Sequence, residues 1–328
     1  MPITKLKNNL RIFGTSFVED YTFDCGNTVP VYDVWNMTSL NQIIGHAKYN
    51  NKDYGNVYYR GECKLHKGLQ PSLLRNIGTI HKADSKMKEL VNAVADDKEL
   101  ANELKVVKLQ FEHEINEKHK KDEHPDFDKD FKYNHRHRIE GVLQHYGIPT
   151  RFIDLVDNHW VALWMGLYHA EHYKNMEDYI HYERREIPYA DFLSGVNLVQ
   201  EELYQYIILM ALPYGKDNSN GIIENDDFVE VDLRQALPST FLRPHAQHGY
   251  VVRKKLHSPD QEYGYDMATE VIGILRMRID RVQEWIGNGK LLTQENLFPS
   301  LAFDRGYQLL LNKNDLFKQH HFEIARFV

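Results

Sequence analysis

Apolar residues between about 80 and 138 recur with helical spacing. Met87, Leu90, Val91 and Val94 are separated by one, three or four positions, which places them on one face of a helix. A second set with the same kind of spacing follows along the chain. Its members are Leu100, Leu104, Val107, Phe111 and Ile115. The pattern predicts two amphipathic helices, followed at 118–137 by a charged, histidine-rich stretch that we interpret as a solvated loop or helix end.

From about residue 200 the pattern changes to short apolar runs that are typical of strands. These runs are 206–212, 228–233, 249–252 and 271–279. An earlier run, 57–60, predicts a strand that ends at Gly61. A helical part closes the pattern, with Val282, Trp285 and Ile286 and then residues 297–311.

These elements predict an α+β fold, with a single domain, a mixed or split β-sheet and a helical insertion at about 80–138. Residues 1–40 show no sustained period and predict an N-terminal arm of short strands and turns. The domain is expected to span 41–315, and 316–328 to form a C-terminal tail.

Polar residues interrupt the apolar stretch that begins at Leu143. Residues 152–156 predict a strand, and Asp157 or Asn158 is suited to cap the apolar helix that follows. Arg151 and Asp154 lie among these buried positions, where an unpaired charge is costly. Either they form structural ion pairs, or they face a ligand, and the pattern alone favours neither.

Two further segments carry candidate chemistry. In Tyr58-Tyr59-Arg60-Gly61-Glu62 an arginine at a strand end can present its planar fork to a phosphate, and the glycine lets a ligand approach the backbone. The alternative is a surface strand followed by a turn. In Arg243-Pro-His-Ala-Gln-His-Gly-Tyr250, Gln247 offers a donor and an acceptor for a ribose hydroxyl or an amide, and the alternative is a polar loop.

Composition narrows the function classes. A formal net charge of −7 over 328 residues gives no general attraction to nucleic-acid backbones. Cys25 and Cys63 are too few for a disulfide framework, no signal-peptide pattern is present, and no apolar run is long enough for a membrane span. We therefore expect a cytoplasmic protein without a membrane partner. The pairs His135/His137 and His169/His172 lack further ligands, so no metal is expected.

Taken together, the three segments resemble the FRG-domain family, whose name comes from a Phe/Tyr-Arg-Gly motif. Tyr59-Arg60-Gly61 and Leu69-Gln-Pro-Ser-Leu-Leu-Arg75 match it first, and Leu143-Gln-His-Tyr-Gly-Ile-Pro-Thr-Arg-Phe-Ile-Asp154 is the more specific part. Asn158 and Val161-Ala-Leu163 follow. Arg243, Ala246-Gln247, Gly249 and Leu297-Phe-Pro-Ser-Leu301 continue the resemblance, which thus covers about 40–311.

The order of these motifs is also similar to that of ADP-ribosyltransferases, which implies an ADP-ribosyltransferase-like fold with NAD as the substrate. By that likeness Arg60, Thr150 and Gln247 take the three characteristic places. The catalytic residues it implies are Arg60, Gln247 and Asp154, and the residues that bind NAD are Arg60, Gly61, Thr150, Arg151, His145 and Tyr146. Gln247 stands where the likeness predicts Glu. This departure matters because a neutral amide does not stabilise positive charge on the ribose as a carboxylate does. Asp154 or Glu140 would have to supply that charge.

Two function hypotheses follow from this resemblance. The first is an NAD-linked ADP-ribosyltransferase or NAD glycohydrolase-like effector in toxicity or defence, with a protein or nucleic acid as the acceptor. The second is a non-catalytic module that binds a nucleotide or a protein. Glu at position 247 would favour the first hypothesis, whereas Gln247 keeps both open.

Overall fold

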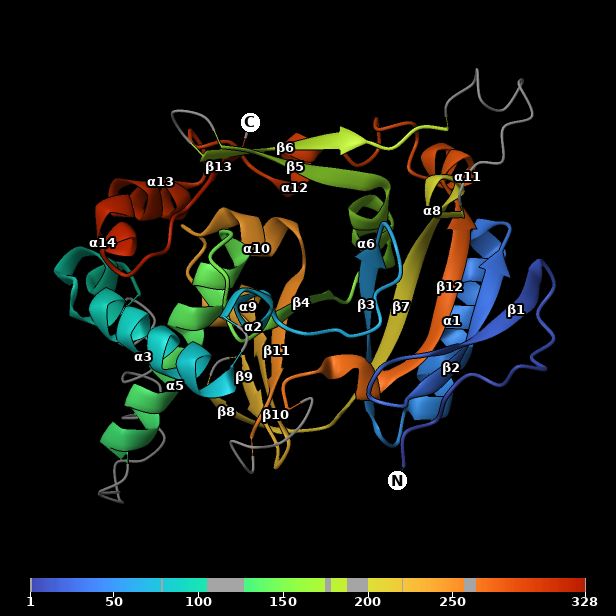
Figure 1. Ribbon diagram of the computed structural model, residues 1–328, viewed down its shortest axis with the longest axis horizontal. Coiled ribbons are helices and arrows are strands. Elements are labelled where there is room, and N and C mark those ends of the chain that lie inside the picture. The colour runs from blue at the N-terminus through green and yellow to red at the C-terminus, as the bar shows by residue number, and fades with distance from the viewer. Residues whose placement is uncertain are drawn as a thin grey trace.

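Most of the described strands belong to one ten-stranded mixed sheet (Figure 1). The computed structural model describes residues 2–77, 79–104, 127–174, 178–187, 200–219, 221–256 and 264–327. The strands of this sheet are β1 Thr15–Thr22, β2 Thr28–Val34, β3 Gly55–Glu62, β4 Ile153–Val156, β7 Tyr204–Pro213, β8 Lys216–Ser219, β9 Ile222–Glu224, β10 Phe228–Asp232, β11 Gly249–Lys254 and β12 Val271–Arg278. Their spatial order is β1-β2-β12-β7-β3-β4-β11-β10-β9-β8. Neighbouring strands are antiparallel except β2 and β12, which are parallel.

A second, three-stranded sheet lies across the top of the molecule in Figure 1. It consists of β5 Tyr168–Lys174, β6 Asp178–Arg184 and β13 Arg326–Phe327, in the order β13-β6-β5. β5 and β6 pair antiparallel, and β13 adds a parallel edge from the end of the chain. Residues far apart in the sequence therefore meet in this sheet, which the sequence pattern did not predict.

The helices of the two clusters around Tyr59 and Val251 pack against the same face of the large sheet. The bounds of the helices are α1 Met37–Asn51, α2 Ser72–Ile77, α3 Ile80–Asp96, α5 Phe127–His145, α6 His159–Leu167, α8 Gln200–Leu203, α9 Leu233–Ala236, α10 Leu242–Ala246, α11 Ile279–Trp285, α12 Gln294–Leu297, α13 Arg305–Asn312 and α14 Asn314–Gln319. The Asn158 side chain caps α6 by accepting from Trp160 N, so Asn158 rather than Asp157 begins this helix. No helix in these described ranges is both long and apolar enough to cross a bilayer.

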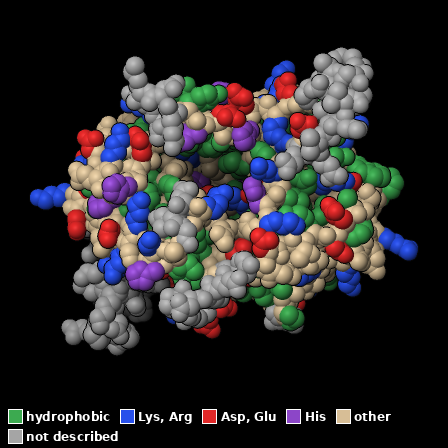
Figure 2. Space-filling view, in the orientation of Figure 1, with side chains coloured by type: hydrophobic (Ala, Val, Ile, Leu, Met, Phe, Trp, Pro, Cys, Tyr) green, Lys and Arg blue, Asp and Glu red, His purple; other side chains and the backbone are tan. Residues whose placement is uncertain are grey.

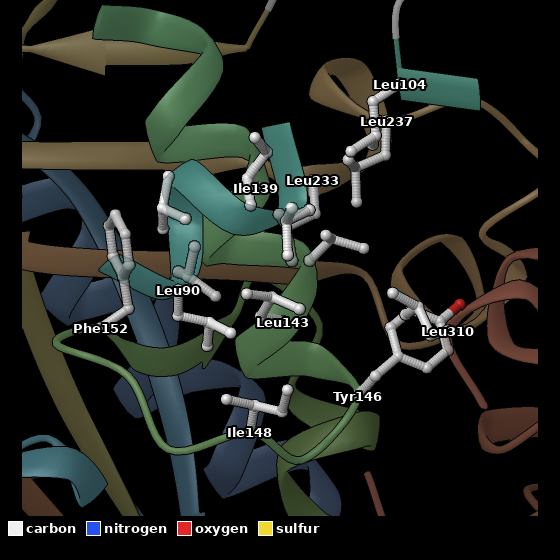
Figure 3. Packing of buried hydrophobic residues seen from close by; sticks show 14 of the residues in the cluster. Leu90, Leu104, Ile139, Leu143, Tyr146, Ile148, Phe152, Leu233, Leu237 and Leu310 are labelled. Carbon is white, nitrogen blue, oxygen red and sulfur yellow. The ribbon is translucent and has the colours of Figure 1, made fainter. Parts of the chain in front are cut away.

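Alternating side chains of the central strands build separate cores on the two faces of the sheet. On β3, Tyr59 packs into a cluster with α1, α6 and α11, whereas its neighbour Tyr58 packs into the cluster on the other face. A third cluster joins α3, α5, α13 and α14 to β9, β10 and β11. Figure 3 shows this packing, with Leu143 and Ile139 of α5 near Leu90 of α3. This packing fixes the end of α5, which carries Gln144 and His145.

The structure confirms the mixed α+β character and most predicted elements. The four later strand predictions correspond to β7, β10, β11 and β12. The predicted helical residues Met87, Leu90, Val91, Val94, Leu100 and Leu104 are helical and buried, while Val107, Phe111 and Ile115 lie outside the described residues.

Two expectations need correction. In the stretch predicted to be a solvated loop or helix end, residues 127–137 belong to α5, in agreement with the helical alternative, but His137 is buried because this helix packs against the sheet; 118–126 lie outside the described residues. The continuous helical part 297–311 is interrupted between α12 and α13, where Pro299 lies. The short strands expected within residues 1–40 are present as β1 and β2, which join the large sheet, and Val31 and Tyr32 are buried there because β2 pairs with β12. The division into arm, domain and tail otherwise stays a prediction.

Candidate functional site

A cleft of about 720 Å³ lies between the end of β3 and the small sheet. Figure 2 shows a hollow near the centre of this face, with basic and histidine side chains at its rim. One wall comes from β3, β4 and the end of α5, and the other from β5, β6 and β13. Because β3, β4 and β11 are neighbours in the large sheet, segments near residues 60, 154 and 247 reach the same cleft.

Arg60 lies in the β3 wall with part of its guanidinium open. Its Nε donates to Glu62 Oε1 at 2.5 Å, and its Nη1 donates to the Asp154 carbonyl oxygen at 2.9 Å. Nη2 has no hydrogen-bond partner among the described residues. Burial acts to lower the pKa of Arg60, but the carboxylates of Glu62 and Asp154 outweigh it and raise that pKa, so the group stays charged.

Arg75 lies near Arg60 and Glu62 at the cleft wall. It comes from α2, lines the cleft and has no ion-pair partner within the ranges that the structure describes. Burial and the neighbouring Arg60 charge both lower the pKa of Arg75. Two guanidinium groups that repel each other at one cleft wall are suited to bind an anion with several oxygens, such as a pyrophosphate.

Asp154 lines the cleft, and a neighbouring amide holds its carboxylate. Its Oδ2 accepts from Gln144 Nε2 at 2.7 Å, and the Gln144 Oε1 accepts in turn from the Thr150 hydroxyl at 2.6 Å. This relay fixes the orientation of the Gln144 amide. Oδ1 receives no donor from another residue in the described part of the chain. Burial raises the pKa of Asp154, while Arg60 and Gln144 oppose that rise.

Gln247 and His145 complete the polar lining. Gln247 Nε2 donates to the Leu297 carbonyl oxygen at 2.8 Å, so the amide is held in place. His145, the last residue of α5, lies close to Gly249 at the start of β11. Arg60 and Gln247 thus line one cleft, as a composite site requires.

The wall from the small sheet is aromatic. Tyr168, Tyr182, Phe298 and Phe327 line it. The Tyr182 and Phe298 ring centroids are 4.4 Å apart, and those of Phe298 and Phe327 are 5.5 Å apart. A wall of this kind can pack against a flat heterocyclic ring of a ligand. Sequence reasoning missed these residues and also Arg75, Lys64 and His66, although Arg75 ends a motif that had been recognised.

Three residues predicted to bind NAD lie outside the cleft lining. Thr150 is fully buried behind Gln144. Arg151 pairs with Glu140 through Nη2 at 2.5 Å and with Asp84 through Nη1 at 3.1 Å. Tyr146 is fully buried, and its hydroxyl donates to Asp304 Oδ2 at 2.7 Å. These three side chains support the walls from behind.

The structure adds packing and pairing constraints at Gly61 and Glu140. Gly61 lines the cleft, but a Cβ on it would lie 1.9 Å from the Ala162 carbonyl oxygen of α6. Close packing of that helix therefore requires the glycine, whatever a ligand does. Glu140 is only 1% exposed and gives both carboxylate oxygens to Arg151, so it is not free to supply charge to a cleft ligand.

In a comparison with known protein families, residues 55–175 match the family model of the FRG domain. The chain contains an FRG domain. This matched part includes Arg60, Arg75, Gln144 and Asp154, whereas Gln247 and Phe327 of the same cleft lie beyond it. No curated protein and no solved structure matches the chain.

Basic side chains outnumber acidic ones in the described lining of the cleft. Among its described lining residues four are Lys or Arg and two are Asp or Glu. In the described ranges no group of three or more His, Cys, Asp or Glu side chains is placed to hold a metal ion. The arrangement can bind an anion, pack against a ring and offer one carboxylate oxygen.

Proposed function

We propose that the cleft binds a dinucleotide of the NAD type and transfers its ADP-ribose part to an acceptor or to water. The observation that carries this proposal is the open Oδ1 of Asp154 beside the partly open fork of Arg60 in one cleft. The cleft volume of about 720 Å³ lies within the range of small-molecule sites.

Arg60 and Arg75 bind the pyrophosphate in this proposal. Arg60 Nη2 and the guanidinium of Arg75 supply donors that no described carboxylate accepts. A ring of the ligand, adenine or nicotinamide, packs against Tyr182, Phe298 and Phe327. Gln247 orients a ribose through its side-chain oxygen, because its nitrogen already donates to the Leu297 carbonyl.

Asp154 takes the place of the missing carboxylate. The bond between the ribose C1′ and the nicotinamide nitrogen breaks, and its electron pair leaves with neutral nicotinamide. Positive charge then develops on the ribose, and the carboxylate of Asp154 stabilises it. The oxygen or nitrogen of the acceptor, or a water, bonds to C1′, and its proton passes to Asp154 Oδ1.

A non-catalytic nucleotide-binding module is the second candidate, favoured by Gln247. A neutral side chain stands where the transferases that the chain resembles carry Glu, and its amide is tied to the backbone. In that case the cleft binds the nucleotide without breaking it. The two candidates share the anion and ring contacts and differ only in the role of Asp154.

The test combines binding and turnover on the purified chain. Calorimetric titration with NAD and with ADP-ribose measures binding, and release of nicotinamide is followed with and without cell extract as an acceptor. We expect binding of both ligands, and release that falls at least about 100-fold in Asp154→Asn. Asp280→Asn, at an exposed ion pair with Arg278, is the matched control. Binding without release supports the second candidate, and no binding contradicts both.

A further inference from the structure

His145 has an unusual position at the inner wall of the cleft. It lines the cleft although it is more than nine-tenths buried. Its backbone carbonyl accepts from Arg243 Nη1 at 3.2 Å, which fixes the end of α5. Neither ring nitrogen of His145 has a hydrogen-bond partner within the described part of the chain. Nδ1 is fully buried, so Nε2 is the ring nitrogen that a cleft ligand can reach. Buried polar atoms are nearly always paired, so an unpaired imidazole in a cleft indicates a missing partner.

Gly249 makes room for this imidazole. A Cβ on Gly249 would lie 2.3 Å from Nε2 of His145 and 2.4 Å from its Cε1. Any other residue at position 249 would therefore push the ring away. Strand pairing also fixes the position of Gly249. It lies opposite Val156 where β11 pairs with β4, the strand that carries Asp154. The chain thus holds the unpaired ring in one place.

The surroundings keep the imidazole neutral. Burial and the nearby charge of Arg243 lower the pKa of His145 to about 3. A neutral imidazole has one N–H donor and one acceptor nitrogen. A phosphate accepts hydrogen bonds only, so the two arginines suit it better than this ring does. The reachable Nε2 donates or accepts according to the tautomer, so its complementary partner is a neutral group that can take either role, as a hydroxyl does.

We propose that His145 binds a ribose hydroxyl of the nucleotide in the cleft and that Gly249 holds the imidazole in position for it. This inference rests on the proposed function, since it assumes a nucleotide ligand. It also predicts how the site selects its ligand: the site recognises one sugar hydroxyl as well as the phosphates. An analogue without that hydroxyl leaves the imidazole unpaired and binds more weakly.

Calorimetry on His145→Ala and Gly249→Ala tests this with ADP-ribose, ADP, 2′-deoxy-ADP and 3′-deoxy-ADP. For the wild type we expect about three- to tenfold weaker binding when the recognised hydroxyl is absent. In His145→Ala this difference should disappear, while the anion contacts remain. ADP-ribose and ADP together tell whether the hydroxyl belongs to the distal ribose, and the deoxy analogues report on the adenosine ribose.

Gly45→Ala is the matched control for Gly249→Ala. A Cβ on Gly45 meets no atom within 4 Å, so binding by this variant should equal that of the wild type. Gly249→Ala should bind like His145→Ala, because the added Cβ displaces the ring. If a variant fails to fold, nitrogen NMR of the His145 ring in the wild-type protein provides the test instead. The ring signals should shift when ADP-ribose saturates the protein.

The possible outcomes separate the two proposals. If the wild type binds ADP-ribose, but His145→Ala weakens all four ligands equally or none of them, the role of His145 is wrong and the nucleotide site stands. Ring signals that stay unchanged at saturation lead to the same conclusion. If the wild type binds none of the four ligands, the proposed function fails and this inference fails with it.

Discussion

Arg151 and Asp154 lie three residues apart in the chain, yet the polar clusters around them differ in how completely they are paired. Arg151 gives Nε and Nη2 to Glu140 and Nη1 to Asp84. Asp154 lines the cleft and receives one donor at Oδ2 from Gln144, while its Oδ1 receives none from another residue in the described ranges. The first cluster is satisfied by the protein itself, whereas the second leaves capacity for a ligand.

The difference distinguishes, within one motif, a polar residue that stabilises the fold from one that is able to bind a ligand. Both residues belong to the same short segment, and both are charged at positions among apolar neighbours. Burial of a charge therefore does not identify a site. The informative property is an accessible donor or acceptor that the fold holds in place and leaves unpaired, as it does at Asp154, Arg60 and Nε2 of His145.

The largest expected effect tests the satisfied cluster. Arg151→Leu leaves the carboxylate of Glu140 buried without its cation, so we expect the free energy of unfolding to fall by about 3–5 kcal/mol. Urea denaturation of wild type and variant measures it. Arg278→Leu is the control, because Arg278 pairs with Asp280 on the surface and should cost at most about 1 kcal/mol. A loss as small as that of the control would show that the buried pair does not stabilise the fold.

A second prediction concerns Glu230, a buried carboxylate that differs from Glu140 in its pairing. Glu230 is 5% exposed and accepts from the Tyr58 hydroxyl, and no cation pairs with it in the described part of the chain. Burial raises the pKa of Glu230 to about 7, although the Tyr58 hydrogen bond opposes the rise. A raised pKa in the folded state means that the stability is fully present below the unfolded pKa of about 4.3 and is lost as the pH rises through 7.

Glu230→Gln removes this titration. The wild type should lose about 3 kcal/mol of stability relative to the variant between about pH 4.5 and 8. Urea denaturation at pH 5, 6, 7 and 8 measures the difference. Glu284→Gln, at an exposed pair with Arg281, should follow the wild type across the range. A difference between Glu230→Gln and wild type that does not change with pH would contradict the assigned titration.

The next prediction concerns the open cluster. Arg60 holds Glu62, the Asp154 carbonyl and, in the proposed function, a phosphate, and a lysine ammonium cannot make these contacts in the same plane. Arg60→Lys should weaken ADP-ribose binding by about 1–3 kcal/mol while the fold survives. Calorimetry measures the affinity, and the surface variant Arg278→Lys is the control. Unchanged affinity in a folded Arg60→Lys protein would remove Arg60 from the site.

Much of the large sheet could be predicted from the sequence, because its strands are buried and carry their own apolar runs. β7, β10, β11 and β12 are of this kind. The small sheet could not be predicted in this way. β5 and β6 read Tyr-His-Ala-Glu-His-Tyr-Lys and Asp-Tyr-Ile-His-Tyr-Glu-Arg, where charged and aromatic residues mix, and their pairing with each other and with β13 forms the sheet. The aromatic wall of the cleft was missed for that reason.

The site itself could be predicted only in part. Arg60, Asp154 and Gln247 were found because local motifs mark them, and they line one cleft. Arg151 and Asp154 could not be told apart, since the partners of Arg151 are 11 and 67 residues away in the chain. The reason for Gly61 was also invisible, because the Ala162 carbonyl that requires it lies on a distant helix.

The smallest expected effect concerns the relay that orients Asp154. Thr150 donates its hydroxyl to Gln144 Oε1 and accepts from Phe152 N at 3.1 Å, so it fixes the amide that donates to Asp154 Oδ2. Thr150→Val keeps the shape of the side chain and removes both bonds, which should cost about 1 kcal/mol, or about fivefold, in nicotinamide release.

Thr150→Ser restores the hydroxyl and is the matched rescue variant. Because Thr150 is fully buried behind the cleft and contacts no ligand, the affinity for ADP-ribose should stay near that of the wild type in both variants. A positioning role therefore lowers kcat in Thr150→Val, leaves binding unchanged and is reversed by Thr150→Ser. If binding and kcat fall together, or if the serine variant fails to recover turnover, Thr150 stabilises the wall of the cleft without orienting Asp154.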